Sequence, residues 1–433
     1  MRLLVLLMLL PACLFADSKE RQKQFPDIYQ LVERAQSVPP EFAASTLLRV
    51  AASPALTDKT WKKELLMDAF RFGGMSRYPM QRSIIRGHGA ESSQASLTSL
   101  AYAQKLDRLS LQGMAVKQMI PLDKAKAWDM FNEIQPPNVS KGSCEDLLLD
   151  NPSAYYDLIP LVIKLPARSM NAETSWMNNF VVRVQSPVEL PLIMNAIGRS
   201  IVLSEQWNLL GASLAAVLDR MSGDDRAFTS SLPEVQEKLG LTEQMMRSWA
   251  NPEPLIVAHR NYLDRHLKEP RCGENKNLPV FADASRAQFM HLMFGSTSRG
   301  LSDADKNTEA WRDEFQAYLR VILDAKPQSA ETGEAFFLRK AGMLTAAVTM
   351  VPTGAERDKA VVQFLAYLAN ENMQQANFLI WFDQLAKLAD LTRSLRPADH
   401  VGFLRAVEAT GHPVMSLYAM RERILVARPA SVQ

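Results

Sequence analysis

The sequence predicts an all-α protein built from antiparallel helix pairs, arranged as an irregular α-solenoid or as a multi-helix bundle. Apolar residues recur at helical spacing along most of the chain. Many of the helical segments are short and joined by short turns, which is typical of antiparallel neighbours. Strand signals are almost absent.

Length and composition exclude several classes of protein. At about 150 residues per domain, 433 residues are enough for two to three domains. With 47% hydrophobic and 22% charged residues, the chain is neither collagenous nor largely disordered. Its formal net charge of +2 gives no electrostatic reason to expect a nucleic-acid partner.

The first residues predict export. Leu3–Leu10 is an apolar run that follows Arg2 and is too short to cross a bilayer, which takes about 20 residues. We expect a signal peptide over residues 1–16, cleaved after Ala16, and a periplasmic or secreted protein without a transmembrane span. Residues 10–13 also resemble a lipobox, although Pro11 departs from its pattern, so a lipoprotein anchored at Cys13 is the alternative. A soluble chain that keeps its apolar start is the third.

The next segment, residues 17–140, predicts two helix pairs. The first spans 41–52 and 59–72, and the second spans 111–120 and 123–134. The stripe in the first pair consists of Trp61, Leu65, Leu66, Ala69 and Phe70.

The middle segment, residues 141–300, holds the best strand candidate. Phe180–Val184 is rich in β-branched residues, but with Trp176 it also fits a helix face, and we interpret it as helical. Ser186 before Pro187 and Ser204 indicate helix N-caps.

The last segment, residues 301–433, again carries helical stripes. Pro397 and Pro413 suit the first turn of helices. The apolar stripes are Trp311, Phe315, Tyr318, Leu319 and Ile322, then Phe378, Trp381, Phe382, Leu385 and Leu388.

Breaks between helices predict the divisions near residues 140 and 300. Residues 135–143, 268–279 and 295–302 interrupt the helical pattern. Cys144 and Cys272 stand at the edges of the first two breaks. In an oxidising compartment two thiols are expected to pair, so we predict a disulfide between them. Two buried thiols that act as small apolar groups are the alternative.

Two resemblances add to this. Residues 114–131 resemble one helix pair of a tetratricopeptide-type solenoid. Together with the exported start, Pro39–Ala44, Trp61–Leu66 and Cys144–Asp146 resemble exported helical proteins of acidobacterial soil bacteria. That resemblance implies a bacterial envelope setting, but it implies no activity and no functional residue.

Common catalytic motifs are missing from the sequence. It has no H-E-x-x-H, C-x-x-C, G-x-S-x-G, S-x-x-K or P-loop pattern. His259 and His266 are seven residues apart, too far to chelate a metal from one helix turn, and a packing or surface role is the better interpretation. The acidic pairs Glu145–Asp146 and Asp224–Asp225 indicate solvated turns or helix starts.

The other histidines also have structural interpretations. We interpret His88 as a mobile loop residue and His291 as a partly buried side chain with a hydrogen-bond partner. His400 and His412 flank a short helix, and His412 lies between two helix ends.

One segment approaches a calcium motif. Asp303, Asp305, Asn307 and Glu314 occupy positions 1, 3, 5 and 12 of an EF-hand loop. Thr308 stands where that loop needs glycine, so we favour a helix start capped by Ser302 and predict no metal and no cofactor.

We therefore predict an exported helical binding or scaffold protein of the bacterial envelope that presents its surface to a protein or peptide. An all-α hydrolase acting on an envelope or extracellular polymer is one alternative. A small-ligand carrier with an apolar pocket between helices, to which the 21 Met would contribute, is the other.

Overall fold

The part of the chain that can be described is helical. The computed structural model describes residues 19–76, 105–137, 152–166, 170–186, 189–201, 204–221, 246–247, 251–266, 291, 294–295, 298, 301–328, 331–370, 378–395 and 400–426. These residues form 17 α-helices and no strand, which confirms the all-α prediction. Cys13, Cys144, Cys272 and His88 lie outside the described residues, as do both acidic pairs. The disulfide, the lipid anchor and the divisions near 140 and 300 stay predictions.

The N-terminal helices form the predicted pairs. Asp58, Asp107 and Asp123 each accept a hydrogen bond from a backbone N–H in the first turn of the helix that follows, which caps that helix. The helices are α2 (Pro26–Ala35), α3 (Pro40–Ala52), α4 (Lys59–Met75), α6 (Arg108–Met119) and α7 (Lys124–Glu133). Contacts between α3 and α4 and between α6 and α7 confirm both predicted pairs.

The middle helices are shorter. They are α8 (Pro152–Tyr156), α9 (Ile159–Val162), α10 (Met170–Val181), α11 (Leu190–Ser200), α12 (Ser204–Arg220) and α14 (Glu253–His266). The helical interpretation of Phe180–Val184 is right only as far as Val181. There α10 ends in a tight turn in which the N–H of Arg183 donates to the carbonyl of Phe180, at 3.1 Å. Three valines within five residues lower the helix propensity here.

The C-terminal helices bury the predicted stripes, except that the side chain of Phe378 lies outside the described set. Trp311, Tyr318 and Trp381 are all buried. Pro413 opens a helix as predicted, and Gly411 ends the previous one in the left-handed region at φ 72°. Pro397 lies outside the described residues. The elements are a 3₁₀ turn, η3 (Asp305–Asn307), then α16 (Glu309–Leu323), α17 (Gly333–Met350), α18 (Ala355–Asn370), α19 (Phe378–Leu395), α20 (His400–Ala409) and α21 (Pro413–Val426).

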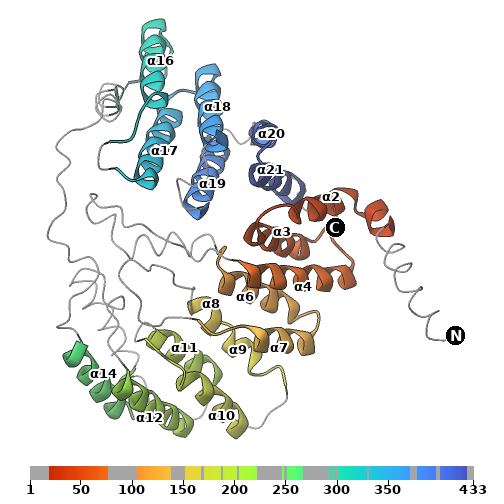
Figure 1. The fold of residues 1–433 in the computed structure, drawn as a ribbon, viewed down its shortest axis with the longest axis vertical. Coiled ribbons are helices and arrows are strands. Elements are labelled where there is room, and N and C mark those ends of the chain that lie inside the picture. Colours follow the sequence, from red (N-terminus) through yellow and green to blue (C-terminus); the bar gives the residue numbers. More distant parts are fainter. Residues whose placement is uncertain are drawn as a thin grey trace.

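The helices follow an arc in which sequence neighbours also lie side by side in space (Figure 1). One branch runs from α2 to α14, and the other runs backwards along the sequence from α21 to α16. The branches meet where α21 contacts α2 and α3. The first and last of these helices therefore form the middle of the arc, and α14 and α16 lie at its two ends.

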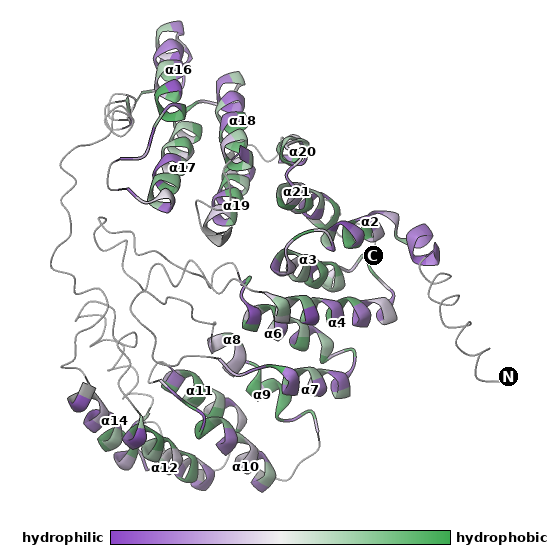
Figure 2. Ribbon diagram, viewed as in Figure 1, coloured by the Kyte–Doolittle hydropathy of each residue, from purple (hydrophilic) through white to green (hydrophobic). Residues whose placement is uncertain are grey.

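Two apolar cores meet at this junction. One core runs through the helices from α2 to α14 and includes Leu417 and Met420 of α21. The second core runs from α16 to α21 and includes Phe42 of α3, whose ring lies 4.9 Å from that of Phe382. Hydrophobic and hydrophilic residues alternate along the helices (Figure 2), as expected of helices that bury one face. Each branch thus completes the core of the other.

Candidate functional site

A pocket of about 320 Å³ lies where the turn after α10 faces α8. This volume is at the lower end of the range typical of small-ligand sites, about 300–1,000 Å³. The residues after α7 also contribute to its wall. The pocket is lined by Pro136, Pro137, Tyr155, Tyr156, Phe180, Val182, Arg183, Val184, Gln185 and Glu189.

Aromatic packing holds the apolar part of this pocket. The ring of Tyr155 on α8 stacks on Phe131 of α7, with centroids 5.6 Å apart. It also lies 6.1 Å from Phe180 at the end of α10, and Phe180 packs edge-on against Trp176 at 4.5 Å. Rings that contact one another in this way lose little freedom when a ligand binds, so the pocket is preorganised.

A buried carboxylate fixes the polar end of the pocket. Glu189 is 2% exposed, and its carboxylate accepts the hydroxyl of Tyr156 at 2.7 Å. It also accepts the backbone N–H groups of Gln185 at 2.9 Å and of Ser186 at 3.2 Å. The bond from Ser186 has the form of half a capping box, which the S-x-x-E spacing signals, but the predicted cap at Ser186 is wrong for α11, because α11 begins at Leu190 with Glu189 in its N-cap position.

Two polar groups that line the pocket remain available. The hydroxyl of Tyr155 forms no hydrogen bond with any described residue, although the residue is only 4% exposed. Arg183 forms no ion pair within the described ranges. Burial raises the pKa of Tyr155 to about 12, with Arg183 opposing the rise and Glu189 adding to it. The hydroxyl therefore stays protonated at neutral pH and can donate a hydrogen bond. Burial, and then Glu189, raises the pKa of Tyr156 much further.

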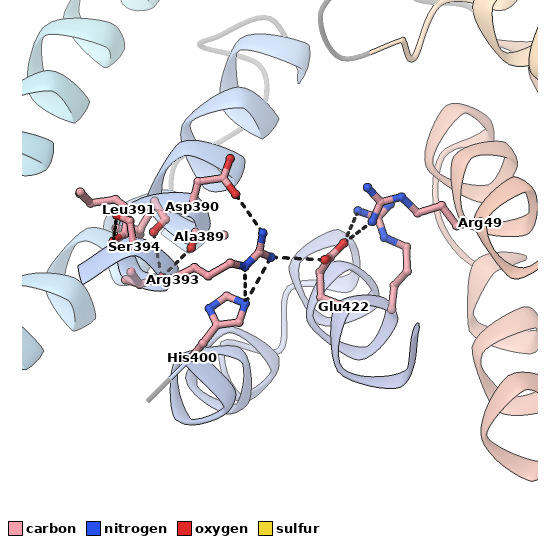
Figure 3. A network of polar contacts seen from close by, with 11 residues as sticks. Arg49, Ala389, Asp390, Leu391, Arg393, Ser394, His400 and Glu422 are labelled. Carbon is pink, nitrogen blue, oxygen red and sulfur yellow. Dashed lines mark hydrogen bonds and ion pairs between the residues drawn. The ribbon is translucent and has the colours of Figure 1, made fainter. Parts of the chain in front are cut away.

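A second polar cluster holds the junction of the arc (Figure 3). The buried carboxylate of Glu422 on α21 pairs with Arg49 of α3, with Arg393 of α19 at 3.5 Å and with Arg421 at 3.1 Å. Arg393 also reaches the ring of His400, at 3.4 Å. Burial, and then Arg49, lowers the pKa of Arg421. Guanidinium groups from three helices converge on one carboxylate, and we interpret the cluster as structural.

The remaining histidines pack as the sequence predicts. His259 is buried within α14, whereas the side chain of His266 lies outside the described set. His291 Nδ1 lies 2.6 Å from the hydroxyl of Tyr318. His412 Nδ1 accepts the N–H of Met415 at 3.4 Å, which caps α21.

The calcium-like segment forms a turn followed by a helix. The carboxylate of Asp305 accepts the N–H and the hydroxyl of Ser302, at 2.9 and 2.6 Å. The expected helix start after Ser302 is wrong, because α16 begins only at Glu309 with Thr308 as its cap. Ser302 precedes the short turn η3 instead, and its hydroxyl accepts the N–H of Asp305, the first residue of that turn, at 3.3 Å. Across the described ranges, no group of three or more potential ligands gathers around a metal position.

Replacing Glu41 with glutamine is expected to stabilise the protein at neutral pH. Glu41 is 2% exposed, and its Oε2 atom is buried without a hydrogen-bond partner. Burial raises its pKa above the ordinary value of 4.5. The folded state therefore holds its proton more tightly, and the stability of the natural protein falls as the pH rises through the window above 4.5. Glu41→Gln removes this loss.

The measurement is urea unfolding of both proteins at pH 4.5 and pH 7.5. We expect Glu41→Gln to raise the free energy of unfolding by about 1 kcal/mol at pH 7.5, in line with the cost of burying an imperfectly paired charge. At pH 4.5 the increase should be smaller. Equal gains at the two pH values would contradict the assignment.

No family model, curated protein or solved structure is similar to this chain. The described helices include none that has both the length and the apolar character to cross a membrane.

Proposed function

We propose that this chain is an exported binding protein of a bacterial envelope that presents its helical arc to a protein or peptide. One observation supports this above others: the pocket joins a preorganised aromatic wall to polar groups that the described residues leave available. Specific binding sites combine an apolar lining with a few placed polar groups in this way. The apolar start of the sequence supports export.

The pocket gives less support to a hydrolase. Its carboxylate, Glu189, already accepts three hydrogen bonds that shape the turn before α11. A general acid or base must instead reach the substrate within hydrogen-bond distance. Among the described residues that line it, none is a histidine, cysteine or serine that could act as a nucleophile or partner base.

A photo-crosslinker placed at the rim of the pocket tests the proposal. Val182 is 48% exposed and lines the pocket, whereas Val362 on α18 is 54% exposed and lies on the other branch. We expect benzoylphenylalanine at position 182, in the full chain in the producing bacterium, to capture one protein or peptide partner reproducibly. The same residue at position 362 serves as the matched control. No adduct at 182, or identical adducts at both positions, would overturn the proposal.

A further inference from the structure

We propose that the pocket beside Tyr155 recognises a carboxylate carried by an apolar group, as at the C-terminus of a peptide that ends in an apolar residue. This inference rests on the proposed function, because it names the part of the partner that enters the pocket. It follows from the charges, the hydrogen-bond donors and the shape of the lining.

The charges of the lining favour an anion. Among the described residues, the charged ones that line the pocket are Arg183, which is exposed, and Glu189, which is buried. Glu189 has its charge offset by the hydroxyl of Tyr156 and by two backbone N–H groups. Within the described residues, no carboxylate forms an ion pair with Arg183. A guanidinium group binds carboxylates through two parallel hydrogen bonds, so a ligand carboxylate would complete the pairing here.

The hydroxyl of Tyr155 supplies a second donor. Tyr155 is only 4% exposed, and its side chain lines the pocket. A hydroxyl that aromatic packing holds in place loses little freedom when it donates a hydrogen bond to a ligand. A carboxylate between this hydroxyl and Arg183 would receive donors from both.

Apart from the polar side chain of Gln185, the rest of the described lining fits an apolar group next to that carboxylate. Pro136 and Pro137 face the pocket together with Phe180 and Val184. None of these side chains can donate a hydrogen bond, so the tail of the ligand is apolar. The cavity of about 320 Å³ can hold one aromatic or large aliphatic side chain and its terminal carboxylate.

Binding of a fluorescein-labelled peptide that ends in Leu-Phe tests the inference with the full-length protein. We expect the free acid to bind at least about 10-fold more tightly than the same peptide with a C-terminal amide, because the amide loses the charge-assisted bonds to Arg183. Arg183→Gln should weaken binding of the acid by about 10- to 100-fold and leave the amide unchanged. Tyr155→Phe should weaken the acid by a smaller factor.

Lys164→Gln is the matched control, since it removes one positive charge from an exposed residue outside the pocket lining. Equal binding of acid and amide, or an equal effect of Arg183→Gln and Lys164→Gln, would overturn the inference. N-acetylphenylalanine that binds as tightly as the peptide would assign the pocket to a small acid and contradict a peptide terminus.

Failure of this inference differs from failure of the proposed function. A partner captured at position 182, together with equal binding of the acid and amide peptides, would support the proposed binding function and contradict carboxylate recognition. A preference for the acid without a captured partner would support carboxylate binding in the pocket and contradict the proposed protein or peptide partner.

Discussion

Replacing Glu422 with glutamine is expected to lower the free energy of unfolding by about 3–5 kcal/mol, the usual cost of removing one partner from a buried ion pair. Glu422 is 6% exposed at its side chain, and Arg421 beside it is 7% exposed. Without the carboxylate, the buried guanidinium of Arg421 keeps its charge and loses its partner. Arg49 and Arg393 are half exposed and can turn to water, so Arg421 accounts for most of the loss.

Urea unfolding followed by circular dichroism measures this effect, and Glu408→Gln is the matched control. Glu408 on α20 pairs with Arg34 at 3.8 Å and with Arg423 at 3.0 Å, and it joins the same branches of the arc. Its side chain is 27% exposed, so the expected loss is at most about 1 kcal/mol. Similar losses in the two variants would show that burial does not set the strength of the Glu422 cluster.

A double variant separates burial of charge from loss of contact. Changing Arg421 and Glu422 together to leucine removes both buried charges, and such replacements are often neutral or stabilising. We expect this variant to recover most of the stability that Glu422→Gln loses. A double variant as unstable as the single one would mean that the pairing across helices, and not the buried charge, holds the junction.

Replacing Glu189 with alanine is expected to lower the free energy of unfolding by about 3 kcal/mol, because hydrogen bonds to a charged group contribute about 1.5–3 kcal/mol each and are not additive. The change leaves the buried hydroxyl of Tyr156 and two backbone N–H groups without their acceptor. Glu133→Ala, at an exposed residue on α7, should change stability by less than about 0.5 kcal/mol.

A double-mutant cycle with Tyr156→Phe makes this test specific. If the carboxylate accepts the hydroxyl in solution, Glu189→Ala should cost less in a Tyr156→Phe background than in the natural protein. The expected coupling is about 1.5–3 kcal/mol, the range for residues that share one hydrogen-bond network. Strictly additive losses would contradict the bond. Binding of the acid peptide should also weaken, since the turn that carries Arg183 is anchored through Glu189.

Local patterns in the sequence predicted the helices well. The stripes at Trp61 and Trp311 are buried as expected, because helical spacing alone determines which side chains share a face. Pro413 also begins a helix, as the short-range rules predict.

Contacts between distant residues were not predictable in the same way. Glu422 looks like any acid on an amphipathic helix, and only the packing of α21 against α3 brings Arg49 to it. The pocket was missed for a similar reason: Pro136 was interpreted as part of a break between helices, and Arg183 as part of a helical segment. Neither pattern indicates that Pro136 and Arg183 line one pocket together with Tyr155 of α8.

The place of α21 in the middle of the arc has a consequence for how the chain matures. The ribosome makes α2 and α3 long before α21, yet the core around them includes Leu417 and Met420 of α21. Until then, the apolar faces that α21 covers have no partner and need protection from aggregation. Chains truncated before α21 keep those apolar faces exposed, whereas chains that include α21 bury them. Chaperones and proteases can therefore recognise and remove the truncated chains.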